Sequence, residues 1–253
     1  MSPRAALATA GVFLAVVVVV VVSTAAVAQR RGTPSPGVAE LPADPVREAF
    51  THAIAPGLAD TTQARLGDFL ARYGRHPLAR DAHHELGLLA YARGDYARAR
   101  DEFRRARGPG SVEEARYWEG LAAFALGRTQ EARTAVLPLA RMRRATPRRW
   151  DAAYLVALSW AQEGRRAEAL AAYRELFALD GQGGAQAAAL YQAIRLAREL
   201  DRGDDVSTWR GRLLRTAPGS PEAASLLAEE KGAPAAPDSA AMRAAARRSA
   251  RTR

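Results

Sequence analysis

The sequence of 253 residues contains no cysteine. This absence excludes disulfides, thiolate zinc sites, iron–sulfur clusters and cysteine nucleophiles together. Aromatic residues make up only 7% of the chain, and valine and isoleucine are scarce outside the N-terminal segment, so there is little material for β-strands. Alanine, leucine and arginine dominate instead, and all three favour helices. The composition therefore predicts an all-α protein.

Lysine is nearly absent too, because it occurs only at Lys231. The formal net charge of +10 therefore comes almost entirely from arginine, a bias that GC-rich coding explains more simply than selection for bidentate contacts does. We accordingly give little weight to the isoelectric point of about 10.8. It indicates acidic partners only weakly, and we predict no nucleic-acid partner.

Motifs that would carry catalysis are also missing from the sequence. It has no Gly-x-Ser-x-Gly elbow, no His-Glu-x-x-His and no Walker or dinucleotide glycine pattern. The neighbouring His83 and His84 diverge by about 100° on a helix and cannot share one metal ion. We therefore predict a non-enzyme with no catalytic residue, no cofactor and no metal site.

Residues 1–28 have the pattern of a secretory signal peptide. A basic start at Arg4 is followed by seven consecutive valines at positions 16–22 and by small residues that end in Ala26-Val27-Ala28. This Ala-x-Ala ending predicts cleavage between Ala28 and Gln29. The alternative is an uncleaved membrane anchor, since the apolar stretch could span about 30 Å of hydrocarbon. We expect an exported protein in the periplasm or at the extracytoplasmic face of the membrane of a GC-rich bacterium.

The rest of the chain divides into three parts by composition. Residues 29–45 are rich in proline and glycine, which predicts a linker. Residues 46–231 carry helical patterns. Residues 232–253 form a basic tail that we expect to be disordered, the alternative being a short helix that forms on a surface.

The middle of the chain is an internal repeat. Its glycine turns at positions 94, 127 and 164 lie 33 and 37 residues apart, and a period in the mid-thirties indicates a helical solenoid with two helices per repeat. Small residues recur in step with the turns, and they mark points where helices cross closely. These residues are Gly87, Gly120, Ala99, Ala132 and Ala169.

The repeat resembles the tetratricopeptide repeat family, and with its export signal the exported type found in bacterial cell envelopes. Clear units cover about residues 80–111, 113–146 and 150–181. The first fits best, through Leu86, Gly87, Ala99, Phe103 and Ala106. The second departs at Glu119, Val136 and Leu139, where the family favours leucine, an aromatic residue and alanine. The resemblance implies a right-handed helical-repeat solenoid.

Degenerate units flank the clear ones. The leading unit is predicted to have helices over residues 45–55 and 60–73. The fourth unit is predicted over residues 185–200 and 206–214, with its turn at Gly203-Asp204, and a closing helix over residues 221–230. Atypical ends are expected in a solenoid, because terminal units cover the exposed core.

The resemblance also implies a concave groove lined by the first helix of each unit. The matching positions are Asp81, His84, Leu88, Tyr91, Glu114, Tyr117, Leu121, Phe124, Asp151, Tyr154 and Leu158. Such a groove has an aromatic and apolar floor with one acidic residue at the start of each unit, and suits a bound peptide. The alternative places the three leucines in the inter-helix core and exposes the aromatic residues alone.

The sequence therefore predicts a non-enzymatic scaffold of the bacterial cell envelope that binds a partner peptide or protein in its groove. The alternative is an accessory or regulatory domain of a cell-wall-processing enzyme that acts on polysaccharide. Exposure of Tyr91, Tyr117 and Phe124 distinguishes them, since a binding groove needs exposed aromatic residues and an enzyme needs a buried acid near a cleft.

Arginine clusters along one edge of the predicted repeats. This basic edge consists of Arg104, Arg105, Arg107, Arg141, Arg143, Arg144, Arg148 and Arg149. Cations stabilise helix C-termini by about 0.3–1 kcal/mol each, which is one explanation. The other is that the edge binds anionic lipid or cell-wall polymer.

Overall fold

The computed structural model describes residues 44–109, 112–146, 148–179 and 184–232. The predicted signal peptide with its cleavage pair Ala28 and Gln29, residues 29–43 of the linker, and residues 233–253 of the tail lie outside these ranges. Within them every regular element is an α-helix, so the all-α prediction is confirmed for this part of the chain. None of these helices is both long and apolar enough to cross a membrane.

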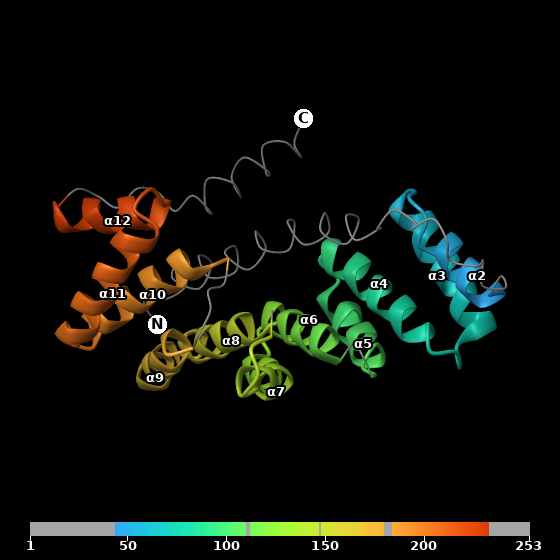
Figure 1. Cartoon of the computed structure of the whole chain (residues 1–253), viewed down its shortest axis with the longest axis horizontal. Helices are drawn as coiled ribbons and strands as arrows, with labels where there is room; N and C mark the ends of the chain where they lie inside the picture. Colours follow the sequence, from blue (N-terminus) through green and yellow to red (C-terminus); the bar gives the residue numbers. More distant parts are fainter. Residues whose placement is uncertain (1–43, 110–111, 147, 180–183, 233–253) are drawn as a thin grey trace, which may run out of the picture. The chain divides into compact units, whose positions relative to one another are not determined.

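The described chain divides into two compact units, and the division falls inside α8. The N-terminal unit, residues 44–155, contains α2 (Pro45–Ala53), α3 (Ala59–Tyr73), α4 (Ala79–Ala92), α5 (Tyr96–Arg105), α6 (Val112–Ala125), α7 (Thr129–Ala140) and the first half of α8 (Arg149–Gln162). From α2 to α7, each helix packs against the next (Figure 1). The helices match the predicted units, including the degenerate leading pair α2 and α3.

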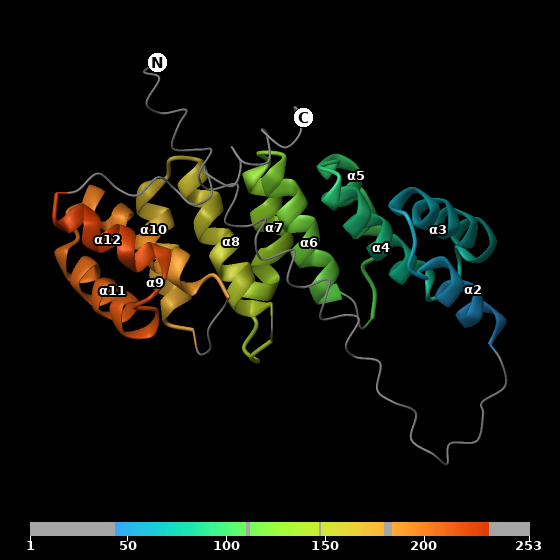
Figure 2. The ribbon, with the colours of Figure 1, turned by 90° about the horizontal axis from the view of Figure 1, so that it is seen from above.

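The C-terminal unit, residues 156–232, contains the second half of α8, α9 (Arg166–Phe177), α10 (Gln186–Glu199), α11 (Gly203–Thr216) and α12 (Pro221–Glu230). Helix α10 packs against α9, α11 and α12 (Figure 2). Leu190, Ile194, Leu213 and Leu226 form fully buried parts of this unit. Helix α12 covers the residues predicted for the closing helix, and its start is capped, since Ser220 Oγ accepts a hydrogen bond from the Ala223 amide at 3.1 Å.

The turns between paired helices use a left-handed residue two positions before the second helix. Gly94, Gly127 and Gly164 have φ of 81°, 74° and 73°, a region that glycine enters without steric cost. In the fourth pair this residue is Asp201, with φ of 54°. The predicted turn at Gly203-Asp204 is therefore wrong, because α11 already begins at Gly203. Aspartate tolerates this conformation better than most residues, so the repeat geometry continues where the glycine signal is lost.

The predicted contact points between paired helices are confirmed. A Cβ atom added to Gly87 would lie 2.6 Å from Cε1 of Phe103, whose side chain is fully buried. A Cβ atom on Gly120 would overlap Cγ1 of Val136. Ala99, which packs in the same interface, is also fully buried. Each pair of helices thus approaches too closely for a larger side chain at these positions.

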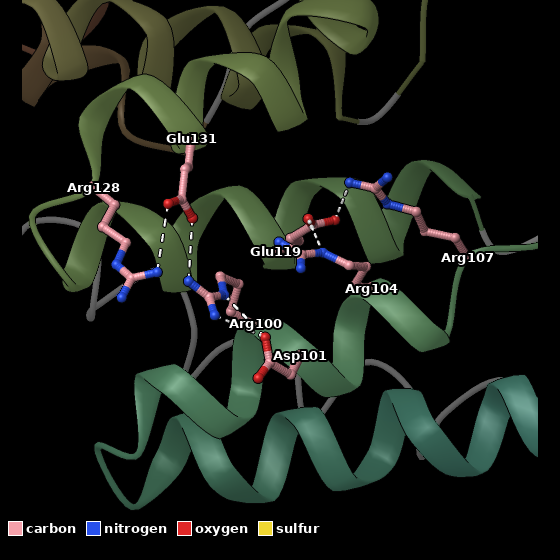
Figure 3. A network of polar contacts seen from close by, with 7 residues as sticks. All are labelled: Arg100, Asp101, Arg104, Arg107, Glu119, Arg128 and Glu131. Atoms are coloured by element: carbon pink, nitrogen blue, oxygen red, sulfur yellow. Dashed lines mark hydrogen bonds and ion pairs between the residues drawn. The ribbon is translucent and has the colours of Figure 1, made fainter.

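The departure at Glu119 has a structural explanation. This side chain is only 7% exposed, yet it accepts a hydrogen bond from Arg104 Nε at 3.3 Å and another from Arg107 Nη2 (Figure 3). Arg104 lies in the last turn of α5 and Arg107 lies just after that helix, whereas Glu119 lies on α6. A buried charge is tolerated only when it is paired, so the acid and the two arginines form one structural group.

Arginine–carboxylate pairs also join positions about one repeat apart. The partners are 31–34 residues apart in sequence. They are Arg93–Asp60, Arg100–Glu131, Arg144–Glu113 and Arg148–Glu114 in the N-terminal unit, and Arg166–Glu199, Arg174–Asp205 and Arg198–Glu229 in the C-terminal unit. Exposed pairs contribute at most about 1 kcal/mol each. Seven of the described arginines therefore join positions about one repeat apart.

Candidate functional site

The structure brings polar residues of three successive repeats together in the N-terminal unit. We call this group the rim cluster, and it consists of Asp81, His84, Glu85, Glu114, Tyr117, Arg148 and Asp151. Asp81, Glu114 and Asp151 are separated by 33 and 37 residues, the same intervals as the glycine turns. They therefore occupy the same place in successive repeats. Glu114 and Tyr117 lie three residues apart on α6 and so share one face of that helix.

Arg148 connects the cluster. Its Nε and Nη2 donate to the two carboxylate oxygens of Glu114, both at 2.8 Å, and its Nη1 donates to Asp151 Oδ2 at 3.3 Å. The same guanidinium lies 4.5 Å from the centre of the Tyr117 ring. Bidentate pairing and stacking on a ring are contacts that arginine makes and lysine cannot reproduce. The site thus holds one arginine by two carboxylates and an aromatic face.

Burial sets the proton affinities of the remaining groups. Desolvation lowers the pKa of His84, although the charges of Glu114 and Asp81 act against this shift. Desolvation raises the pKa of Glu85, and the nearby charge of Asp81 raises it further. It also raises the pKa of Asp151 despite the opposing effect of Arg148. The cluster therefore consists of partly desolvated carboxyl groups around a histidine that favours its neutral form.

His84 retains unused hydrogen-bonding capacity. Its ring packs edge-on against Phe103, with 5.6 Å between centroids. Its Nε2 atom is buried and has no hydrogen-bond partner. Buried polar atoms normally find a partner, and among the described residues of the cluster this nitrogen is the one buried side-chain atom without one. The neighbouring His83 points elsewhere, since its Nδ1 lies 2.7 Å from Glu102 Oε2.

The predicted exposed aromatic floor is wrong. Tyr91 and Tyr117 are each 6% exposed and Phe124 is 1% exposed. Tyr91 packs against Tyr96 and Trp118, and Arg148 covers Tyr117. These large rings fill the space between helices because the surrounding alanines are too small to do so. The accessible part of the site is consequently polar.

The other predicted groove residues are of two kinds, some buried in the core and some accessible to solvent. Leu121 and Leu158 belong to the core, at 2% and 1% exposed, and Tyr154 is also buried. The core alternative is thus confirmed for these two leucines, whereas Leu88 on α4 is half-buried. Asp81 is exposed, and the Glu114 side chain is 45% exposed. Leu158 lies in the C-terminal unit and the rim cluster in the N-terminal unit.

Most of the predicted basic edge is paired within the chain. Arg104 and Arg107 contact Glu119, Arg105 lies 3.5 Å from Glu102, Arg144 contacts Glu113, and Arg148 belongs to the rim cluster. Arg149 is half-buried, and its Nε lacks a partner. Arg141 and Arg143 are exposed. Binding of anionic lipid or cell-wall polymer stays a prediction, and these two exposed arginines are the ones that could serve it without breaking the pairs above.

Two members of the rim cluster were not predicted to lie in the groove. Glu85 follows His84 directly and was not among the projected positions. Arg148 was assigned to the basic edge, although it lies 34 residues after Glu114 and three before Asp151. Arg148 is thus one repeat from Glu114 and one helical turn from Asp151. These two intervals are the sequence signal that could have placed Arg148 in the rim cluster. Among the described residues, no group of three or more histidine or acidic side chains could hold a metal ion.

Comparison with known proteins supports the repeat assignment. Residues 59–114 and 117–183 match the sequence model of the tetratricopeptide repeat. Among solved structures, PilF of Pseudomonas aeruginosa superposes with a TM-score of 0.52 and 20% identity, covering 73% of this chain and 82% of that one. MamA of Desulfovibrio magneticus RS-1, from residue 41 to its end, gives 0.53 and 15%, covering 67% and 92%. At these identities the likeness shows the fold alone. A search of curated protein sequences finds no match.

Paired helices, left-handed turns at a fixed place and small residues in step with them define an α-helical repeat protein. Over residues 59–114 and 117–183, these helices are tetratricopeptide repeats.

Proposed function

We propose that this protein is a scaffold that holds a partner protein at the rim cluster, through polar contacts and not through the exposed aromatic floor expected from the sequence, because Tyr91, Tyr117 and Phe124 are buried. Repeat proteins of this kind present extended surfaces to protein partners. The observation that carries the proposal is the recurrence of Asp81, Glu114 and Asp151 at one position of three successive repeats. Asp81 and the exposed part of Glu114 are the carboxylates open to a ligand, because Asp151 is only 17% exposed and pairs with Arg148.

The chemistry of the cluster favours a basic segment of the partner. The cluster holds four carboxyl groups, those of Asp81, Glu85, Glu114 and Asp151, and one arginine, which pairs with Glu114 and Asp151, in a chain whose net charge is +10. Arg148 shows how the site holds a guanidinium, between carboxylates and over a ring. Asp81 and the exposed part of Glu114 can take a second cationic side chain in the same manner.

We place this function outside the cytoplasm of a bacterium. The support is the N-terminal sequence, with its basic start, apolar run and Ala-x-Ala ending before Gln29. An exported scaffold would meet its partners in the cell envelope. A protein purified from its own cells should then have Gln29 as its first residue, and an intact mass that includes Met1 would contradict cleavage.

The partner site is tested by removing the charges of two neighbouring acids on α4, Asp81 and Glu85. We expect the Asp81→Asn, Glu85→Gln variant to capture its crosslinked partner from intact cells about tenfold less than the parent does, because two attractive contacts to a basic segment are lost. Asp68→Asn with Glu175→Gln is the matched control, since both residues are exposed helix positions away from the cluster. Equal capture by the site variant and the control, at equal helical content, would contradict the proposal.

A further inference from the structure

The fourth repeat differs from the others at its groove positions. Adding the last repeat interval of 37 residues to the groove positions Asp151, Tyr154 and Leu158, and to Ala161 one helical turn further on, gives Ala188, Tyr191, Arg195 and Arg198. The recurring acid is therefore lost here, and two arginines replace the apolar residues. The aromatic position persists as Tyr191. The groove positions of the fourth repeat thus have the opposite charge from those of the rim cluster.

Two of these positions, Tyr191 and Arg198, contact the end of α12. The Tyr191 hydroxyl donates to Glu229 Oε1 at 2.5 Å, and Arg198 donates to Glu229 at 3.1 Å and to Glu230 at 3.0 Å. Arg210 on α11 binds both carboxylate oxygens of Glu230, at 2.8 and 2.9 Å. The adjacent carboxylates of Glu229 and Glu230 therefore accept the hydrogen bonds of one tyrosine and two arginines. Helix α12 lies against α10, the helix that carries the first two of these groups (Figures 1 and 2).

The contact between α12 and these side chains is weak enough to be reversible. The side chains of Arg198, Arg210 and Glu230 are 34%, 41% and 27% exposed, so water and salt weaken their attraction. Apolar anchoring comes from Ala223 and Leu226, which are fully buried. The helix is short, at ten residues, and helices of this length depend on their packing rather than on their own propensity.

We propose that Tyr191, Arg198 and Arg210 form a second binding surface, specific for a helical segment with two adjacent acidic residues, and that α12 is its built-in occupant. A partner with such a segment would compete with α12 for the surface. This surface is independent of the rim cluster, which has the opposite charge and lies in the other unit. Release of α12 would thus control access to one end of the repeat array.

The test uses the full chain and a fluorescent peptide with the sequence of residues 219–232. The parent should bind it weakly, because its own α12 fills the surface. Glu229→Gln with Glu230→Gln should loosen α12 and increase the affinity for the peptide at least about tenfold, since the peptide no longer competes with a tethered copy of itself. Leu226→Ser, which removes the apolar anchor, should increase peptide binding by a second route.

The controls separate this surface from other effects. Adding Arg198→Gln and Arg210→Gln to the loosened chain should abolish binding, and a peptide with glutamine at positions 229 and 230 should not bind. Asp81→Asn with Glu85→Gln should leave peptide binding unchanged, so that failure here is distinct from failure at the rim cluster. Equal peptide binding by the parent and both loosened variants, or binding that survives loss of both arginines, would overturn the proposal.

Discussion

Replacing Gly87 by leucine is expected to destabilise the N-terminal unit by about 1–3 kcal/mol, the usual cost of overpacking a core. A Cβ atom at this position already lies 2.6 Å from the ring of Phe103. That ring cannot move aside, because it is fully buried and stacks on Trp118 of the next repeat at 5.8 Å between centroids. Chemical denaturation followed by circular dichroism measures the loss.

Gly67→Leu is the matched control. Gly67 lies within α3, is exposed, and has no atom within 4 Å of a Cβ added to it. Because glycine costs about 1 kcal/mol relative to good helix formers inside a helix, this variant should be slightly more stable than the parent. Hydrogen exchange in the Gly87→Leu protein should increase in α4 and α5 more than in α9, since repeat units are stabilised by their neighbours. Equal stability of the two variants, or a uniform increase in exchange, would contradict the repeat register.

Removing both arginines that contact Glu119 is expected to have a comparable effect. Arg104→Gln with Arg107→Gln leaves a carboxylate that is 7% exposed without its two cationic partners. Breaking a fully buried pair costs about 3–5 kcal/mol. Because the side chains of Arg104 and Arg107 are 54% and 32% exposed, solvent already screens part of this interaction, and we expect about 2–3 kcal/mol. The free energy of unfolding in urea measures it.

Glu119→Leu provides the contrast. It introduces the residue that the repeat family favours at this position and removes the need for any charged partner. Replacing a buried ion pair by a well-packed apolar side chain is often neutral or stabilising, so this variant should match or exceed the parent. It should also rescue the double arginine variant. Two results would contradict the pairing of Glu119 with Arg104 and Arg107. One is a double arginine variant as stable as the parent, and the other is a Glu119→Leu variant that loses as much free energy of unfolding as the double variant does.

The fold could be predicted from the sequence because its signals are local. The glycine turns and the small residues at helix crossings each act within a few residues, and both are found where predicted. The turn of the fourth pair was misplaced because Asp201 adopts the left-handed conformation without being glycine. Its position two residues before α11 follows from the geometry of the repeat and not from its residue type.

The site was harder to predict because exposure depends on several repeats at once. Projection onto the family pattern placed Asp81, His84, Glu114 and Asp151 correctly as neighbours. It could not show that Tyr117 is covered, because the covering group, Arg148, comes from the following repeat. The arginine content, taken alone, similarly indicates only a coding bias, although several arginine–carboxylate pairs join positions 31–34 residues apart. Such intervals carry information about packing that composition alone hides.

The central claim is that a partner lies on the rim cluster, and site-specific photocrosslinking in intact cells tests it most directly. A photoreactive amino acid would replace Asp81, which is exposed at the cluster, or Ala97, which is exposed on α5. We predict a discrete crosslinked product from position 81 and none from position 97, with the product lost when Glu85→Gln and Glu114→Gln are added. Equal products from both positions, or a product from position 97 alone, would contradict the claim.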